Sequence, residues 1–162
     1  ELAYTVGTVH GINAVADGTW VPLPFNDPGV RKPLVHLVDE AKAAGKVKEV
    51  FDDIKGFYEM DFVPGVYRVM ANDPGYLGDH WTYVKTAFTD RKLDRLTKEI
   101  LALAASMTAK SDYGIDFHMR EVRRLGLSEK GILEVVFLVK HFCVDNKISR
   151  VLLLDSDFDD LL

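Results

Sequence analysis

Apolar residues recur at the three-to-four-residue spacing of a helix face from residue 34 to residue 142. Breaks in this pattern separate seven predicted helices, at residues 34–44, 47–57, 66–72, 74–88, 93–107, 112–125 and 129–142. The strongest pattern belongs to residues 93–107, whose apolar stripe has small alanines beside it for close helix packing. The body of the chain contains no strand-like alternation of apolar and polar residues. The pattern therefore predicts an all-α bundle.

Capping residues at the breaks support these boundaries. Asp73 precedes Pro74, a pairing suited to the free amides of a helix start. Ser111 or Asp112 can cap the next-to-last helix, and Ser128 can cap the last. Glycine after a helix favours its termination, so Gly45 is expected to separate the first two helices and Gly126 to end the sixth.

The two ends of the chain differ from its helical body. Residues 1–33 are rich in Gly, Pro, Thr and Val without a helical period, so we expect an irregular N-terminal arm. Residues 34–154 form the predicted helical domain, in which residues 151–154 prolong the last helix or pack as a tail. Residues 155–162 are expected to be a solvated acidic tail. The last helix is apolar on most sides, which predicts burial in the centre or in a subunit interface.

Composition narrows the class of protein. A chain of 162 residues with 48% hydrophobic content is long enough for one domain with its own core. A net charge of −5 disfavours nucleic acid as a partner. Cys143 is the single cysteine, which excludes an internal disulfide and favours a reducing, cytoplasmic location. No apolar run is long enough to span a membrane, whereas the absence of an initiator Met leaves open a targeting segment removed before Glu1.

Three segments, at residues 50–77, 93–106 and 111–127, together resemble the alkyl hydroperoxidase D (AhpD) and carboxymuconolactone decarboxylase superfamily. The first includes Val63-Pro-Gly-Val-Tyr-Arg, the second places Glu99 inside an apolar run, and the third ends in a helix followed by Gly-Leu. Glu99 precedes Ser111 by twelve residues, and His118 follows Gly114 by four, as in the family. The resemblance covers residues 46–140 and implies an AhpD-like helical bundle.

The chain departs from the peroxidase members of this family at two positions. Their reactive and resolving cysteines would stand at Gly114 and Ser111. Glycine has no side chain, and a serine hydroxyl is not reversibly oxidised as a thiolate is. Cys143 lies far along the next helix and has no partner cysteine. Alkyl hydroperoxidase-type activity is therefore disfavoured.

The resemblance implies that Glu99 and His118 face one another from two packed helices. The decarboxylase branch also lacks the cysteine pair, keeps a comparable His and needs no cofactor. We therefore expect a cofactor-independent lyase or isomerase that acts on a small carboxylated substrate. In this hypothesis His118 moves the proton, Glu99 orients its ring, and Tyr113 is a possible hydroxyl donor.

Four further residues are predicted to contact the substrate: Arg68, His80, Trp81 and Ser111. A carboxylate needs a cation, and an apolar pocket needs an aromatic wall. His80 and Trp81 could equally be core or interface residues, and Arg68 could pair with Asp73.

Structural roles compete with this chemistry. Glu99 could be a buried carboxylate that His118 satisfies and that only specifies helix packing. Arg120, Arg123 and Arg124 are expected to form a solvated or intersubunit face. His118 and Glu121 share a helix face near Asp112 and Asp116, but the chain has no Glu-x-x-His segment of the di-iron type, so no metal is predicted. Phosphate-binding glycine motifs are also absent from the sequence.

A non-catalytic role is the competing hypothesis. Members of the family are commonly homo-oligomers with sites near subunit interfaces, and an AhpD-like fold could survive as an oligomeric subunit or binding protein. An aromatic and proline-rich arm containing Trp20 and Phe25 could wrap a partner surface. Residues 52–55 and 63–68 resemble, more weakly, haloacid dehalogenases, which are built from two such repeats.

Overall fold

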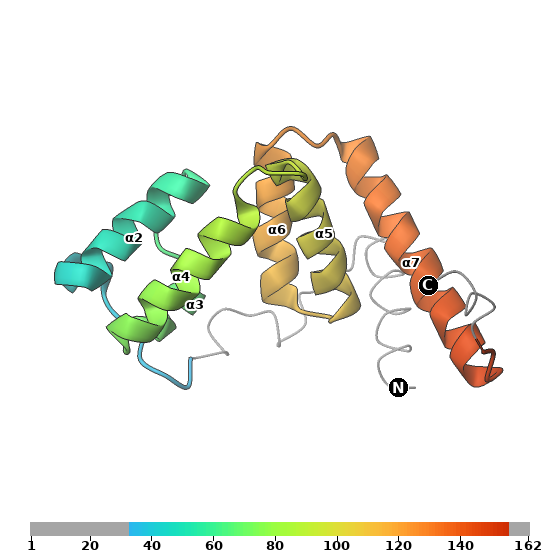
Figure 1. Ribbon diagram of the computed structural model, residues 1–162, viewed down its shortest axis with the longest axis horizontal. Coiled ribbons are helices and arrows are strands. Elements are labelled where there is room, and N and C mark those ends of the chain that lie inside the picture. The colour runs from blue at the N-terminus through green and yellow to red at the C-terminus, as the bar shows by residue number, and fades with distance from the viewer. Residues whose placement is uncertain (1–32, 156–162) are drawn as a thin grey trace, which may run out of the picture.

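A computed structural model of the protein describes residues 33–155, and the all-α prediction is confirmed (Figure 1). Within these residues one 3₁₀ turn, η2 (Glu40–Lys42), precedes six α-helices. They are α2 (Gly45–Tyr58), α3 (Gly65–Met70), α4 (Pro74–Phe88), α5 (Arg95–Thr108), α6 (Asp112–Arg124) and α7 (Glu129–Val151). Helices α2 to α4 form one group, α5 and α6 form a central hairpin, and α7 lies on the far side of that hairpin.

Three of the predicted helix caps are confirmed. The Asp73 carboxylate accepts from the amides of Gly75 and Tyr76 at the start of α4. Ser111 accepts from the Gly114 amide at the start of α6, and Ser128 accepts from the Gly131 amide at the start of α7. These side chains satisfy amides that have no partner inside their own helix.

The predicted helix at residues 34–44 is wrong. Only Glu40–Lys42 turns, as a 3₁₀ segment capped by the Asp39 side chain. Leu34 and Val35 are exposed, so their apolar spacing does not mark a buried helix face. Gly45, predicted as a boundary, is itself the first residue of α2 and has a positive φ of 53°. Residues 1–32 of the predicted arm and 156–162 of the predicted tail lie outside the described residues.

Two apolar clusters hold the helices together. The larger one packs α2, α3 and α4 through the buried side chains Phe51, Ile54, Tyr58, Met60, Val63, Tyr67, Ala71, Leu77 and Trp81. The smaller one joins α5, α6 and α7 through Leu103, Val122 and Ile132. The candidate site described below is lined by side chains of the larger cluster and of α6.

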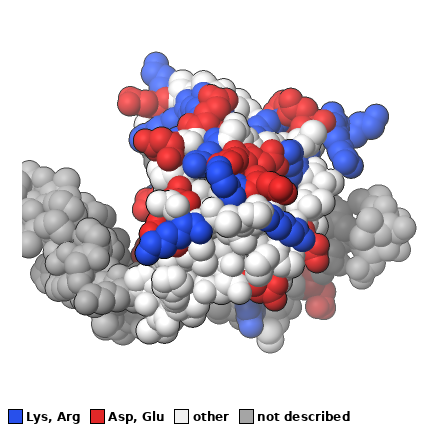
Figure 2. Space-filling view, turned by 90° about the vertical axis from the view of Figure 1, so that its left-hand side faces the viewer, with Lys and Arg blue, Asp and Glu red and all other residues white. Residues whose placement is uncertain are grey.

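A buried indole joins α2 to α4. Trp81 donates its indole N–H to Asp53 at 2.7 Å, and Lys85 donates to the same carboxylate at 2.7 Å and 2.8 Å. Partial burial opposes ionisation of Asp53, but the hydrogen bonds from Lys85 and Trp81 outweigh it and hold the pKa of the carboxyl below its usual value. On the molecular face beside these helices, acidic and basic side chains are interspersed (Figure 2).

Helix α7 is much less buried than the sequence predicts. It packs on α5, and Ile132 is its one buried side chain. The expectation of central burial is therefore wrong for the single chain. Large apolar side chains along the helix and its C-terminal end are exposed: Leu133, Phe137, Leu138, Phe142, Val144, Ile148 and residues 151–154. Helix α7 ends at Val151, so residues 152–154 form a tail. Across residues 33–155, the helices are all too short or too polar to cross a membrane.

Candidate functional site

A cavity of about 250 Å³ lies between the α2–α4 group and the α5–α6 hairpin. Its wall combines aromatic rings, valines and one imidazole, contributed by Tyr58, Val66, Tyr67, Val84, Phe88, Tyr113, Gly114, Phe117 and His118. Helix α6 supplies four of these residues, because positions 113, 114, 117 and 118 share one helix face. The cavity is mainly apolar, with a few polar groups that could orient a small ligand.

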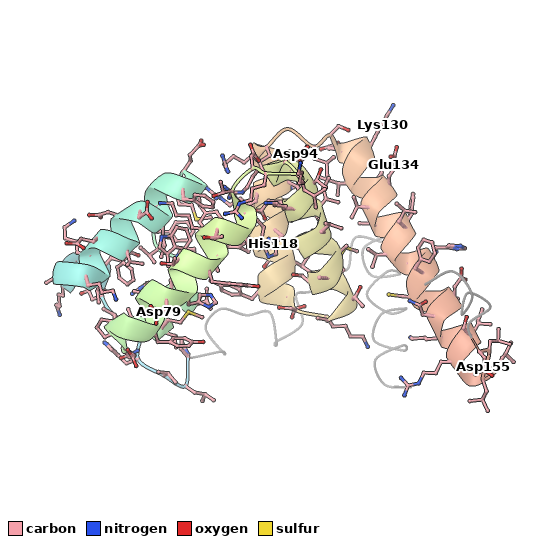
Figure 3. All side chains as sticks on the ribbon, viewed as in Figure 1. Asp79, Asp94, His118, Lys130, Glu134 and Asp155 are labelled. Atoms are coloured by element: carbon pink, nitrogen blue, oxygen red, sulfur yellow. The ribbon has the colours of Figure 1, made fainter. Side chains whose placement is uncertain are left out.

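His118 connects this cavity to a buried carboxylate. Its Nδ1 lies 2.8 Å from Oε2 of Glu99, whose side chain is completely buried on α5. The phenyl ring of Phe88 stacks on the imidazole at a centroid distance of 6.0 Å, and Phe117 meets it edge-on at 5.2 Å. Figure 3 shows His118 in the centre of the molecule, where α4 meets the hairpin. The ring is therefore fixed by packing on its faces and by hydrogen bonding at Nδ1.

Arg95 neutralises the buried Glu99. Its Nε donates to Glu99 Oε1 at 3.0 Å, and one terminal nitrogen donates to Glu121 Oε2 at 3.2 Å. The guanidinium carbon lies 4.0 Å from the ring centroid of Phe57, a cation–π distance. Both carboxylates are completely buried, whereas the Arg95 side chain is 15% exposed. One arginine thus links the two buried acids of α5 and α6.

Two more arginines surround Glu121. Arg120 donates to Glu121 Oε1 at 2.9 Å, and Arg124 donates to Glu121 Oε2 at 2.8 Å. The hydrogen bonds from Arg124 to Glu121 raise the pKa of the Arg124 guanidinium. The sequence predicts that Arg120, Arg123 and Arg124 form a solvated or intersubunit face. Arg123 is exposed and the Arg120 side chain is 40% exposed, but Arg120 and Arg124 also pair with the buried Glu121.

Tyrosine hydroxyls supply the other polar atoms near the cavity. The hydroxyls of Tyr58 and Tyr67 lie 3.4 Å apart, within hydrogen-bond range. Burial raises the pKa of both phenols, so both remain protonated near neutral pH. The Tyr113 hydroxyl accepts from the Val66 amide at 3.3 Å and so links α6 to α3.

The sequence-predicted residues divide into two groups in space. Glu99, His118 and Tyr113 lie at or beside the cavity, and Ser111 caps the helix that forms its wall. The remaining three lie elsewhere. Arg68 donates its Nε to the Val38 carbonyl at 2.9 Å, His80 stacks on Tyr76, and Trp81 is buried in the larger core.

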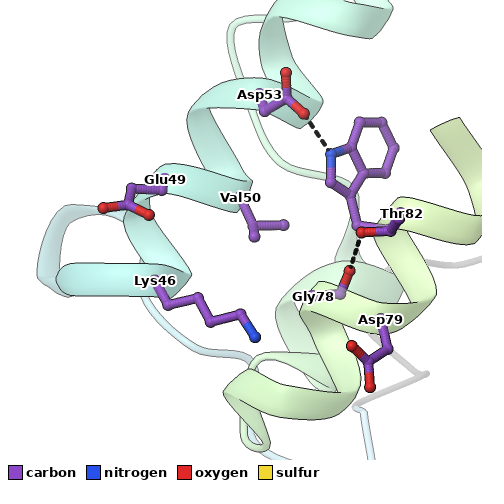
Figure 4. Close-up of a pocket in the computed structure, with 8 residues that line it drawn as sticks. Lys46, Glu49, Val50, Asp53, Gly78, Asp79 and Thr82 are labelled. Carbon is purple, nitrogen blue, oxygen red and sulfur yellow. Dashed lines mark hydrogen bonds between the residues drawn. The ribbon is translucent and has the colours of Figure 1, made fainter.

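A second cavity, of about 340 Å³, lies between α2 and α4 (Figure 4). Trp81 and Asp53 form part of its wall, together with Lys46, Glu49, Val50, Gly78, Asp79 and Thr82. Lys46 extends across it toward Gly78, where an added Cβ would lie 2.8 Å from Nζ. The histidine–glutamate pair belongs to the first cavity, which is the candidate site for chemistry.

Carboxylates near His118 do not gather around it as metal ligands would. Glu121 is held by arginines, and Asp112 and Asp116 are exposed on α6. Among residues 33–155, no group of three or more His, Cys, Asp or Glu side chains could hold a metal ion.

Comparison with solved structures places this geometry in a family. A crystal structure of the alkylhydroperoxidase AhpD core from Rhodospirillum rubrum superposes with a TM-score of 0.76 and 30% sequence identity, covering 82% of this chain and 99% of that one. The chain belongs to the AhpD-like superfamily. The model of the carboxymuconolactone decarboxylase family, part of the same superfamily, matches residues 77–153 of this AhpD-like chain. These residues include both members of the Glu99–His118 pair.

A curated relative of this AhpD-like protein is an (R)-2-haloacid dehalogenase from Pseudomonas putida. It is 27% identical over 115 residues, a match that covers 68% of this chain. The chain spans about a third of the dehalogenase's length, since the match covers 36% of it.

Gly114, where the family resemblance places a peroxidase cysteine, packs closely against Ser106 of α5. A Cβ added at Gly114 would lie 2.6 Å from Ser106 Oγ and 3.1 Å from Ser106 Cβ. Any larger residue at position 114 therefore requires Ser106 to move. The space next to the start of α6 fits glycine, and a Cβ there requires the Ser106 side chain to shift.

This contact predicts an unusual response to alanine. Gly56→Ala, at an exposed position of α2 with no atom within 4 Å of the added Cβ, should stabilise the protein by about 0.5–1 kcal/mol. Gly114→Ala should instead lower the free energy of unfolding by about 1 kcal/mol, because the added Cβ would be packed too closely against Ser106. Adding Ser106→Ala to Gly114→Ala should reduce that cost, and urea denaturation of the single and double variants would measure the difference in the free energy of unfolding. Equal stabilisation by both glycine substitutions would disprove the contact.

Several site residues carry no clear signal in the sequence. Arg95 follows Arg91 and Lys92 in a charged stretch of the sequence, and only the fold shows that it faces two buried acids. Phe88 fits the apolar pattern of its predicted helix, which indicates only packing, and Tyr58 lies just beyond the predicted helix at residues 47–57. The i to i+4 spacing of Arg95 and Glu99 is the one signal that could have indicated their ion pair.

Proposed function

We propose that this AhpD-like protein is a cofactor-independent acid/base catalyst, a lyase or isomerase that moves a proton of a small substrate. The observation that supports this proposal is the 2.8 Å contact between His118 Nδ1 and a completely buried Glu99, on the wall of a cavity. A carboxylate that accepts from Nδ1–H leaves Nε2 unprotonated in the neutral ring, and Nε2 can then act as a base. His118 is the catalytic residue of the proposal, and Glu99 is its positioning residue.

The residues that line this cavity limit the charge that a substrate can carry. The sequence resemblance implied a small carboxylated compound, with Arg68 as a candidate cation. Among the described residues that line the cavity there is no Lys or Arg, and Arg68 bonds to the Val38 carbonyl. Recognition of a carboxylate would therefore rest on His118 in its charged form and on the tyrosine hydroxyls. An uncharged compound needs no such cation.

Deuterium exchange tests the proposal without a known substrate. Wild-type protein in D₂O would be mixed with a panel of small ketones, lactones and carboxylates, and loss of their C–H signals would be followed by proton NMR. Exchange faster than in the protein-free solution is the expected result for at least one compound class. Exchange at the protein-free rate for the whole panel would count against acid/base catalysis.

A second candidate function follows from α7. Its exposed apolar residues, among them Phe137, Leu138 and Phe142, form a surface of the kind that packs in an oligomer. In this alternative the protein is a homo-oligomeric, non-catalytic subunit or binding protein that retains the AhpD fold. Light scattering of wild type and Phe137→Glu would show whether α7 drives assembly, and the exchange assay distinguishes the two functions.

A further inference from the structure

We infer that the paired hydroxyls of Tyr58 and Tyr67 bind the oxygen of a small uncharged ketone and stabilise the enolate that forms when His118 removes a proton beside the carbonyl. This inference rests on the proposed acid/base function and specifies its substrate class. It also assigns a role to two tyrosines that the proton transfer itself does not use.

Geometry brings the required groups together. Tyr58 on α2, Tyr67 on α3 and His118 on α6 all line the same cavity. The two phenol oxygens are 3.4 Å apart, so only one of their two protons can lie between them. Within residues 33–155, no other hydrogen-bond partner is found for either hydroxyl. The second proton is therefore available to a ligand oxygen.

The environment keeps these hydroxyls as donors. Burial raises the pKa of Tyr58 and of Tyr67, and the nearby Glu99 carboxylate raises both further. A neutral phenol beside an apolar wall donates to a developing negative charge more strongly than water does, because its donor is already oriented and the local dielectric is low. The first hydroxyl also polarises the second through their shared hydrogen bond.

The proposed step is balanced without a further reactant. His118 Nε2 takes a proton from the carbon beside the carbonyl, and the electrons of that C–H bond form a carbon–carbon double bond. The carbonyl π electrons move onto oxygen, which accepts a hydrogen bond from the tyrosine pair. Return of the proton from His118 to carbon restores the ketone or gives its isomer.

The lining also explains the preference for an uncharged ligand. Among the described lining residues, His118 is the one that can become cationic, and its Nδ1 is bound to Glu99. The rings of Phe88 and Phe117 provide the apolar surface that a hydrocarbon body needs. The cavity of about 250 Å³ is large enough for a bicyclic ketone.

Two probes test this assignment separately from turnover. 2-Tetralone is an uncharged ketone with exchangeable C–H groups, and 2-naphthol has the planar shape of its enol. Exchange of 2-tetralone in D₂O would be measured by NMR, and binding of 2-naphthol by its fluorescence. Naphthalene, which lacks the oxygen, controls for apolar binding. Tyr83→Phe, at an exposed tyrosine of α4, is the matched control.

Tyr67→Phe is expected to slow exchange of 2-tetralone by about 100-fold, as loss of one oxyanion donor does. It should weaken 2-naphthol binding about tenfold and leave naphthalene binding unchanged, whereas Tyr83→Phe should change neither exchange nor binding. Tyr58→Phe should act in the same direction. Circular dichroism and the unchanged naphthalene affinity would show that each variant is folded with its cavity intact.

The failures of the two proposals are distinguishable. Wild-type exchange that depends on His118 but not on Tyr67 would overturn the tyrosine assignment and leave acid/base catalysis standing. Tyr67-dependent binding of 2-naphthol without exchange of any compound would support the oxygen-binding pair and overturn proton transfer. Binding of 2-naphthol and naphthalene with equal affinity in all variants would overturn the tyrosine assignment.

Discussion

Arg95→Met should lower the free energy of unfolding by about 3–5 kcal/mol, because it removes the cation that two buried carboxylates share. Glu99 and Glu121 are both 0% exposed, and Arg95 lies 3.0 Å and 3.2 Å from their oxygens. Methionine keeps most of the side-chain volume, so the loss should be mainly electrostatic. Urea denaturation of wild type and variant measures it.

An exposed arginine provides the matched control for this prediction. Arg123 is exposed on α6, so Arg123→Met should change stability by no more than about 0.5 kcal/mol. Adding Glu99→Gln to Arg95→Met should recover part of the lost stability, since it removes one of the uncompensated charges. A loss below about 1 kcal/mol for Arg95→Met would mean that the buried network does not hold the hairpin together.

Glu99→Gln should slow deuterium exchange of the substrate C–H groups nearly as much as His118→Gln, with each rate reduced by about 10²–10⁴-fold. His118→Gln removes the base. Glu99→Gln removes the acceptor that holds the proton on Nδ1, and an amide can instead donate to Nδ1 and move the proton to Nε2. The ring then presents an N–H to the cavity and has no lone pair for the substrate.

Two exposed residues serve as controls for this pair. Glu134→Gln and His141→Gln alter side chains on the surface of α7 and should leave the rate unchanged. If Glu99→Gln kept full exchange while His118→Gln lost it, Glu99 would be a packing residue and not a positioning residue. If both variants kept full exchange, the pair would have no part in the chemistry.

Helix positions were readable from the sequence because capping and periodicity are local. Asp73, Ser111 and Ser128 each satisfy amides two or three residues away, so their roles need no knowledge of the fold. The error at residues 34–44 has the opposite origin. Leu34 and Val35 have helical spacing, but a helix there would need a surface to pack against, and both side chains are exposed.

The candidate site was only partly predictable. The Glu99 and His118 positions followed from the family spacing, and the structure brings the two side chains together. The cavity wall could not be derived in this way, because Tyr58, Tyr67 and Phe88 come from three different helices. Their convergence depends on how α2, α3 and α4 pack against the hairpin, which local patterns do not specify.

The packing of α7 is likewise not specified by local sequence patterns. An apolar helix indicates that a surface must be covered, but the sequence does not say whether the same chain or another one covers it. In the single chain α7 packs on α5 and buries only Ile132. The predicted interface between subunits therefore remains the hypothesis that Phe137→Glu tests.

The position of the proton on the His118 ring is the most direct test of the proposed acid/base function. Nitrogen-15 NMR of histidine-labelled protein, with His118→Gln to assign the signals, would identify the protonated nitrogen and its response to 2-naphthol. We expect the proton of the basic tautomer on Nδ1 and an Nε2 signal that shifts when 2-naphthol binds. A proton on Nε2, or an Nε2 signal unmoved by saturating 2-naphthol, would contradict the claim that Glu99 directs a basic His118 into the cavity.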